Sequence, residues 1–478
     1  MKQQRSNLFR KFYYSLYLSF KNTFQPAFIK GKNYLKKKLD SIKDNNLQQN
    51  LLNALPFWIG AIITGVVAVL YARLFHLAEM GTAWIFHLNK WLLFIITPLS
   101  FLLSWWLVKK YAPYSRGSGI PQVSASIELA TPKKYYLLNK LLSVRIIFIK
   151  ILSSLVMILG GGVIGREGPT IQIAGSIFKK INDLLPDWYP KISKKNMLIT
   201  GAAAGLAAAF NTPLGGIVFA IEELTTTHFS YFKSALIAGV IIAGLTALNI
   251  LGPYLYLGYP QVKGTSLWII FPVLLVALLA GYAASAMGKI ILYILKRKKE
   301  LTTHFSQVTY CLIAGLVVAS MGVFISVHAF GSGKEIMEST LFTDQKYLEW
   351  YIPIARFFGT IVSFSNGSSG GIFAPSLGAG ASIGSVLSGW FELSASNSNL
   401  MILCGMVGFL TGITRSPFTA AILVLEMTNS SNIIFYLMIA GLAANLIATQ
   451  VDKHSFYDHL KLQYIREVDK ESDSNLQK

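Results

Sequence analysis

The sequence predicts an all-α membrane protein made of two structurally repeated halves, with many broken and re-entrant helices. Three observations predict this class: the composition, a series of interrupted apolar segments, and an internal repeat. Of the 478 residues, 53% are hydrophobic and only 14% are charged, against about 25% in a typical soluble domain. Too little charge is present to cover a soluble surface, which excludes a soluble enzyme and a disordered regulator.

The formal net charge of +21 by itself would suit a nucleic-acid-binding protein. The basic residues, however, form short clusters between apolar runs, as in the cytoplasmic loops of membrane proteins. We therefore expect a lipid bilayer and no nucleic acid as partner. Cys311 and Cys404 lie in apolar segments and predict no disulfide framework. The seven histidines lack the spacing of metal ligands, so we expect no metal and no cofactor.

Residues 1–50 differ from the rest because they are basic and aromatic. This composition indicates an amphipathic segment that lies at the membrane interface on the cytoplasmic side. No short apolar core with a small-residue cleavage site is present, so a signal peptide is not predicted.

Apolar segments follow one another along the remaining chain. A full crossing needs about 20 apolar residues, and several of these segments are shorter or are interrupted by Gly or Pro. Irregular backbone at membrane depth is tolerated only where it is buried in protein or lines a cavity. The segments are 56–75, 90–108, 145–163, 197–210, 213–224, 233–250, 269–295, 306–327, 350–364, 399–414, 417–428 and 432–449.

One topology places the basic clusters on a single side, with the amino terminus inside. It contains a re-entrant piece at 118–130 and a half-helix at 168–180. We divide the chain into the segment 1–50, a first membrane repeat 51–250, a linker 251–268, a second repeat 269–450, and a short final helix with a cytoplasmic tail at 451–478. Both termini are expected in the cytoplasm.

The internal repeat appears as identities that lie 204 positions apart. Weak internal symmetry with paired broken helices is typical of transporters, whose binding site lies at midplane between the repeats. The identities do not fix the relative orientation of the halves; the topology permits an inverted arrangement, which we expect. The pairs are Gly201 with Gly405, Leu206 with Leu410, Pro213 with Pro417, and Glu222 with Glu426.

Gly- and Pro-rich stretches at 117–121, 165–169 and 370–375 each precede an apolar helix. A helix start has unpaired N–H groups and a partial positive charge, so it attracts an anion without a formal positive charge. Lysine or arginine there would hold the anion too tightly for release. Glycine lets the backbone approach an ion closely, and Ser118 adds a hydroxyl donor.

The three stretches, Gly117-Ser118-Gly119-Ile120-Pro121, Gly165-Arg166-Glu167-Gly168-Pro169 and Gly370-Gly371-Ile372-Phe373-Ala374-Pro375, resemble the signature motifs of the CLC family of chloride channels and chloride/proton antiporters. Their order and approximate spacing also match. The stretch 201–223 is especially similar to the bacterial members, and the resemblance covers about residues 55–465.

The resemblance implies an anion site with two side-chain donors. Ser118 would bind the central anion, and Tyr457 would supply the second hydroxyl. Backbone N–H groups of Ile372 and Phe373 would bind from one helix, and those near Gly168 from another. Serine at position 118 resembles the chloride-preferring members.

Glu167 is the expected gate and external proton acceptor. Its ionised carboxylate mimics the anion and blocks the site, whereas the protonated side chain can swing away, so chloride and proton compete through one group. An ionisable residue at membrane depth is functional by default. The structural alternative is that Glu167 pairs with Arg166 as a helix cap.

Glu222 and Glu223 end an apolar helix, where the helix dipole disfavours acids. The resemblance implies that Glu223 transfers protons on the inner side and that Glu222 lines the water route beside it. Alternatively, both simply face cytoplasmic water. Glu426 is expected to be structural. Lys150, which aligns with a lysine of the family, either biases the field in the path or snorkels.

The predicted function is exchange of chloride for protons by a homodimer in a bacterial inner membrane, with a separate path in each subunit. The alternative is a passive chloride channel that uses the same anion site. Ile221 and Ile434 lie in segments expected at the dimer interface. A fluoride exporter fits less well because the motifs follow the chloride pattern. An intramembrane enzyme lacks a Ser/His, Asp/Asp or metal-ligand constellation, so we expect no enzymatic activity.

Overall fold

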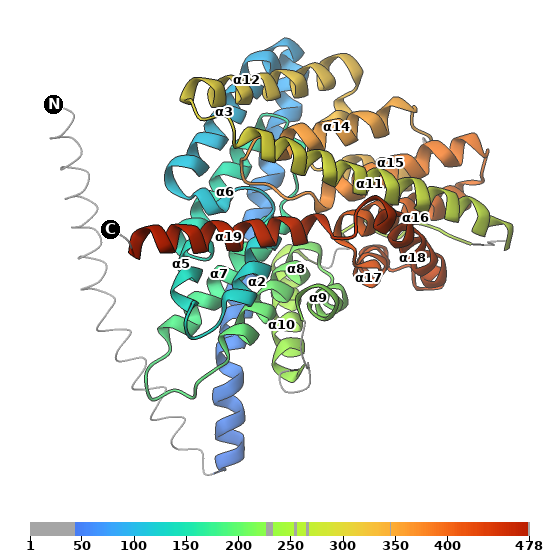
Figure 1. The fold of residues 1–478 in the computed structure, drawn as a ribbon. Coiled ribbons are helices and arrows are strands. Elements are labelled where there is room, and N and C mark those ends of the chain that lie inside the picture. The colour runs from blue at the N-terminus through green and yellow to red at the C-terminus, as the bar shows by residue number, and fades with distance from the viewer. Residues whose placement is uncertain (1–43, 226–232, 253–255, 264–266, 345, 477–478) are drawn as a thin grey trace. The chain divides into compact units, whose positions relative to one another are not determined.

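The computed structural model describes residues 44–225, 233–252, 256–263, 267–344 and 346–476, and these residues form helices (Figure 1). Most of the predicted segment 1–50 lies outside the described residues. The helices are α2 (Asn45–Asn89), α3 (Leu93–Tyr111), α4 (Ile120–Leu129), α5 (Leu138–Leu141), α6 (Val144–Leu159), α7 (Glu167–Leu184), α8 (Lys194–Phe210), α9 (Pro213–Phe219), α10 (Lys233–Leu251), α11 (Ile270–Lys298), α12 (His304–Ser320), α13 (Lys334–Phe342), α14 (Tyr351–Ser365), α15 (Phe373–Trp390), α16 (Ala395–Thr414), α17 (Pro417–Thr428), α18 (Ile434–Val451) and α19 (Phe456–Leu476).

The chain divides into two compact units. The smaller consists of Met1–Leu55 with Trp188–Pro190, within which the Tyr189 hydroxyl donates to the Leu52 carbonyl at 2.6 Å. The larger consists of Pro56–Asp187 with Lys191–Lys478. Helix α2 begins in the smaller unit, and every side-chain contact, site and pocket described below belongs to the larger unit.

Seven segments of the described residues are long and apolar enough to cross a membrane. The helix that contains the first predicted apolar segment, 56–75, is longer than that segment, because α2 continues beyond residue 75 to Asn89. A helix satisfies its own backbone hydrogen bonds whatever its side chains are, so a drop in hydropathy does not end it. The Asn89 side chain then accepts the Trp91 N–H at 3.0 Å and starts a new turn.

The expected short and broken helices are present. Helix α4 has 10 residues, α9 has 7 and α17 has 12, and each carries proline in its first turn. Proline suits this position because the N–H that it lacks would have no partner within the helix. The last turn after α9, Ala220–Leu224, is π-helical and contains both Glu222 and Glu223.

The repeat appears as a reciprocal contact between α9 and α17. Glu222 accepts the N–H groups of Phe418 at 3.2 Å and Thr419 at 2.6 Å. Its repeat partner, Glu426, accepts those of Leu214 at 3.1 Å and Gly215 at 2.9 Å. Every residue of one contact lies 204 positions from its counterpart in the other. Such an exchange relates these two segments by a local two-fold axis, as in an isologous interface.

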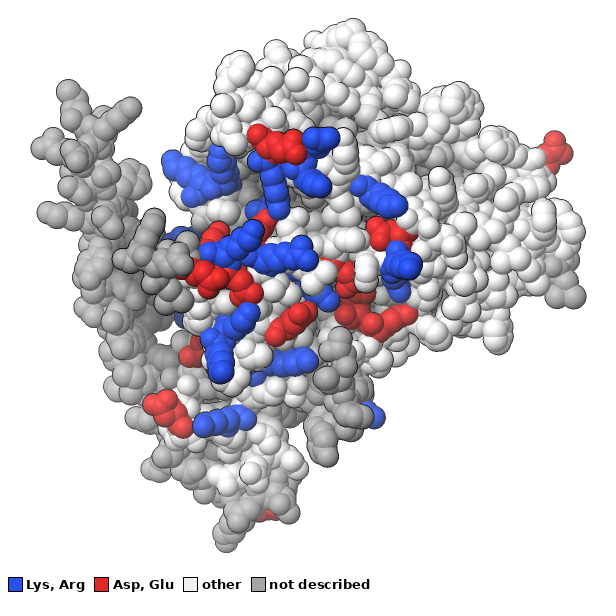
Figure 2. Space-filling view, viewed as in Figure 1, with Lys and Arg blue, Asp and Glu red and all other residues white. Residues whose placement is uncertain are grey.

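The final helix is longer than expected, because α19 contains 21 residues and includes most of the predicted tail. It lies across the face viewed in Figures 1 and 2, where charged side chains gather around it, and the surface above and to the right of them in Figure 2 is largely uncharged. Its acids pair with bases from loops that are distant in sequence, and these ion pairs extend the helix beyond Tyr457. The pairs are Glu467 with Arg116 and Lys299, Asp469 with Lys134, and Glu471 with Lys140.

Candidate anion site

Backbone hydrogen bonds join the three Gly-rich stretches directly. The N–H of Gly117 donates to the Ser368 carbonyl at 2.7 Å, and the N–H of Gly370 donates to the Gly117 carbonyl at 3.1 Å. Gly165 and Gly371 exchange two bonds of 2.8 Å each. Segments more than 200 residues apart in the sequence are thereby held as one cluster.

Three helices start at this cluster, namely α4, α7 and α15, and none of the three starts has a side-chain cap. Their first N–H groups are therefore available to an anion, with the positive end of each helix dipole behind them. Gly168, in the first turn of α7, lies against Ser118, because a Cβ at position 168 would collide with the serine hydroxyl. This close approach explains the glycine.

The two predicted hydroxyl donors also meet at this cluster. Ser118 and Tyr457 are buried, and the tyrosine hydroxyl faces the serine. Neither hydroxyl has a hydrogen-bond partner within bonding distance among the described residues. The Tyr457 ring stacks on Phe373, with ring centroids 6.2 Å apart. A buried hydroxyl without a partner costs about 1–3 kcal/mol, so this pair suits a ligand that accepts from both.

Glu167 begins α7 and is buried, with 1% of its surface exposed. Its Oε1 accepts from the Tyr256 hydroxyl at 3.3 Å, and its Oε2 has no hydrogen-bond partner among the described residues. The carboxylate lies beside Gly165, where a Cβ would collide with Oε2. The Arg166 guanidinium donates to the Ala209 carbonyl at 3.3 Å.

Tyr256 is a site residue that the sequence did not indicate. It lies in the predicted linker 251–268, where no motif or spacing distinguishes it. The structure packs its ring edge-on against Phe210, at a centroid distance of 5.0 Å, and Phe210 in turn packs against Phe373 at 6.2 Å. A continuous row of ring contacts thus connects Tyr256, which binds Glu167, to Tyr457.

Glu223 and Glu222 make different contacts although they are adjacent. The Oε2 of Glu223 accepts from the Ser416 hydroxyl at 2.6 Å. Glu222 is bound to the start of α17, where it also accepts from the Thr419 hydroxyl at 2.7 Å. The structure therefore places Glu222 as a helix cap and does not bring it to the Ser118–Tyr457 pair.

Lys150 supports the loop before Ser118. Its side chain is fully buried, so it does not snorkel, and its Nζ donates to the carbonyls of Ser115 at 2.9 Å and Gly117 at 2.8 Å. The Ser369 hydroxyl also donates to the Ser115 carbonyl, at 2.7 Å. These bonds fix the backbone that carries Ser118.

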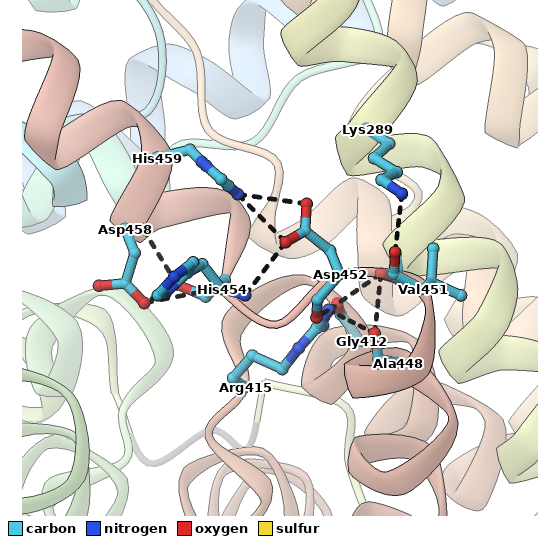
Figure 3. Close-up of polar contacts among 11 residues, drawn as sticks. Lys289, Gly412, Arg415, Ala448, Val451, Asp452, His454, Asp458 and His459 are labelled. Atoms are coloured by element: carbon cyan, nitrogen blue, oxygen red, sulfur yellow. Dashed lines mark hydrogen bonds and ion pairs between the residues drawn. The ribbon is translucent and has the colours of Figure 1, made fainter.

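The loop before Tyr457 is held by charged groups at the end of α18 (Figure 3). Arg415 donates to the carbonyls of Ala448 at 2.8 Å and Asp452 at 3.1 Å, and Lys289 donates to that of Val451 at 2.7 Å. Cations at a helix carboxyl end are favourable. The Asp452 carboxylate in turn contacts His459, two residues after Tyr457, at 3.2 Å.

The start of α19 has a capping box of the Ser-x-x-Asp type. The Ser455 hydroxyl accepts the Asp458 N–H at 3.0 Å and donates to the Asp458 carboxylate at 2.8 Å. The same carboxylate accepts the Ser455 N–H at 3.4 Å. Tyr457 lies inside this box, so the cap and the loop together fix where its ring enters the site.

Known proteins match most of the chain. The family model described as voltage gated chloride channel matches residues 100–449. The H(+)/Cl(-) exchange transporter ClcA of Cronobacter sakazakii is 30% identical over 413 residues, which cover 81% of this chain and 85% of that protein. The ClcA of Vibrio cholerae is 28% identical over 419 residues, with coverage of 84% and 86%.

Solved structures share the fold. A slow cyanobacterial Cl-/H+ antiporter superposes with a TM-score of 0.75 at 23% identity, covering 87% of this chain and 98% of that one. A CLC-type fluoride/proton antiporter gives a TM-score of 0.71 at 18% identity, with the same coverage. At these identities the likeness shows the fold alone.

The matches confirm the family resemblance that the three motifs predicted, the all-helical membrane fold, and a transport protein rather than an enzyme. The family model alone spans far more than half of the chain. This multi-pass membrane protein belongs to the CLC family of voltage-gated chloride channels and transporters.

Proposed function

We propose that the protein is a secondary active antiporter that exchanges chloride for protons, with a separate path in each subunit of a homodimer. One observation carries the proposal: the buried Glu167 carboxylate lies at the cluster where three uncapped helix starts meet. Such a site suits an anion, and the carboxylate is itself an anion. Chloride and ionised Glu167 would therefore exclude each other.

The exchange follows from this competition. Chloride accepts hydrogen bonds from Ser118, Tyr457 and the N–H groups of Ile372, Phe373 and Gly168. When Glu167 takes up a proton, it loses its attraction to the helix starts and releases the site to chloride. When it loses that proton, it returns and displaces the anion. Because no lysine or arginine contacts the hydroxyl pair among the described residues, binding stays weak enough for release.

We assign the inner proton transfer to Glu223. It contacts Ser416, the residue directly before α17, and lies on the π-helical turn that follows α9. π-Helical turns frequently occur at functional sites. Glu222 is expected beside the same water route, and its cap on α17 fixes the backbone next to Glu223.

The surface composition supports a proposed assembly and orientation. Large apolar side chains are exposed on α17, α18 and the turn after α9, including Ile221 at 46%, Phe418 at 52% and Phe435 at 78%. Ile434, also predicted there, is half-buried. We place the homodimer interface on this apolar surface. The charged face around α19 lies on the cytoplasmic side by the positive-inside rule, in a bacterial inner membrane with both termini inside.

Proteoliposomes test the exchange against its alternative, a passive chloride channel. An imposed chloride gradient should drive protons uphill, and the reversal potential should depend on both ions. A reversal potential that follows chloride alone would support the channel. The curated relatives are named for Cl(-) and one structural neighbour for fluoride, so the same assay with fluoride in place of chloride tests selectivity. We expect chloride to be transported faster.

A further inference from the structure

We propose that a basic pocket, distinct from the anion path, binds one anionic phospholipid of the bilayer. The pocket has a volume of about 650 Å³ and lies where the end of α3, the start of α6 and the end of α7 meet, with Glu471 of α19 at its wall. Nothing in the proposed ion exchange uses it.

Two cations of this pocket have no ion-pair partner among the described residues. Four basic side chains line it, against the two acids Asp183 and Glu471. Lys179 donates to Asp183 at 2.6 Å, and Lys140 donates to Glu471 at 3.0 Å. Arg145 and Lys180 are exposed and pair with no other described residue. The described lining of the pocket therefore has an excess of two positive charges, which favours an anionic phosphate.

An apolar stripe leads away from the pocket along α6. Val144 is 43% exposed, Phe148 is 69% exposed and Leu152 is 47% exposed. A spacing of four residues places all three on one face of the helix. Helix α3 packs beside α6, ends at the same pocket with Tyr111, and exposes Leu103 at 46%. The pocket thus continues into a surface that suits acyl chains.

The depth of the pocket suits a lipid headgroup. Trp106 and Tyr111 pack edge to face near the end of α3, with ring centroids 5.6 Å apart, and Lys110 lies over both rings. Tryptophan, tyrosine and snorkelling lysine are typical of the boundary between the headgroups and the acyl chains. A phosphate in the pocket would therefore lie at the level of the lipid phosphates.

The positive charge of the pocket and the apolar stripe on α6 together discriminate among the ligands that could bind there. The amino-terminal residues 1–43 contain many lysines and arginines and a single acid, Asp40, so a basic pocket repels them. A free phosphate would use the cations and leave the stripe on α6 without a function. A diacyl phospholipid with a negatively charged headgroup fits both parts, and we commit to this occupant.

Native mass spectrometry of the purified full-length protein tests the proposal, by titration with phosphatidylglycerol and, separately, with phosphatidylcholine. At about one kcal/mol per basic residue near an anionic lipid, two cations should give phosphatidylglycerol about thirtyfold tighter binding at one site per subunit. Arg145→Gln with Lys180→Gln should reduce its binding to the level of phosphatidylcholine. The control, Lys191→Gln with Lys296→Gln, removes two exposed lysines outside the pocket and should change nothing.

Three outcomes would overturn the proposal. The first is equal binding of the two lipids by the unmodified protein. The second is retention of phosphatidylglycerol by the pocket variant. The third is full competition by soluble glycerol phosphate at the concentration of the lipid, which would mean that the acyl chains contribute nothing. Phe148→Asn provides an independent check, since it changes the stripe without changing charge and should weaken binding of the lipid but not of glycerol phosphate.

Discussion

At the scale of single residues, the account depends on two carboxylates in different surroundings. Glu167 is buried at a helix start, with one oxygen bound to Tyr256 and the other without a partner among the described residues. Glu223 is bound by Ser416. A buried carboxylate exchanges its proton only when its surroundings tolerate both states, and each contact can be removed separately by mutation.

Glu167→Gln should keep chloride flux and abolish coupled proton transport, because glutamine retains the shape of the side chain but cannot ionise. Chloride and proton fluxes measured in the same proteoliposomes check this. The control is Glu128→Gln, which removes an exposed carboxylate at the end of α4 and should leave both fluxes unchanged. Full coupling in the Glu167 variant would remove this residue from its proposed role.

Glu223→Val should abolish proton movement and leave chloride binding intact. The expected reason is that valine cannot carry a proton, whereas the helix starts that hold the anion are untouched. Calorimetric titration with chloride, together with proton flux, separates the two effects. Ser416→Ala removes the contact but not the carboxylate, so it should retain proton transport. An unchanged proton flux in the valine variant would mean that Glu223 simply faces water.

At the scale of elements, Glu426 caps the start of α9 and Glu222 caps the start of α17. The two caps are equivalent, so each provides a comparison for the other. Glu426→Ala leaves the first N–H groups of α9 without an acceptor, and loss of a cap costs about 0.5–2 kcal/mol. Glu222→Ala should cost a similar amount, because the local two-fold relation gives it the equivalent contact. Thermal unfolding in detergent measures both. Unchanged melting temperatures for both variants would contradict the assignment of these glutamates as caps.

The attachment of α19 should depend on pH through Glu467. Burial opposes ionisation, but Arg116 and Lys299 prevail and lower the pKa of Glu467 below its usual value. Because the pKa is lower in the folded chain, the ionised carboxylate stabilises the folded state at pH values above the pKa of the unfolded chain, about 4.3. This stabilisation is lost as the pH falls through the lower pKa of the folded chain. The protection of α19 amides against hydrogen exchange, taken relative to the intrinsic exchange rate at each pH, should therefore fall as the pH drops through the lowered pKa of Glu467.

Glu467→Gln provides the comparison for this pH dependence. It removes both ion pairs at once, so the protection of α19 amides should already be lower at pH 7 and should change less on acidification. If the variant and the unmodified protein have the same exchange rates at every pH, the ion pairs of Glu467 do not hold the helix.

At the scale of the whole molecule, the proposed dimer predicts where two copies meet. Ile221→Cys and Phe435→Cys should cross-link between subunits in liposomes with a short bifunctional maleimide. Phe271→Cys, on α11, is the control, since Phe271 is 65% exposed but lies outside the predicted interface. The natural cysteines, Cys311 and Cys404, are buried and give little background. Equal cross-linking of all three variants would contradict this interface.

The meeting of the three helix starts could be predicted from the sequence, whereas the residues that support them could not. The helix starts at residues 120, 167 and 373 depend on local backbone conformation, and nearby glycine, proline and serine residues mark them in the sequence. Tyr256 and the buried position of Lys150 depend on contacts between distant segments, which no local pattern encodes. Predictions from hydropathy also placed the ends of α2 and α19 too early in the chain. A helix continues through polar residues when tertiary ion pairs or neighbouring helices support it.

Crystals soaked in bromide, an anomalous scatterer that substitutes for chloride, give the most direct test of the central claim that Glu167 and the anion compete for one cluster of helix starts. We predict a bromide peak between the Ser118 and Tyr457 hydroxyls in the unmodified protein, and a second peak in Glu167→Gln at the place that the carboxylate occupies. Absence of bromide beside Ser118, or identical peaks in both proteins, would contradict the account.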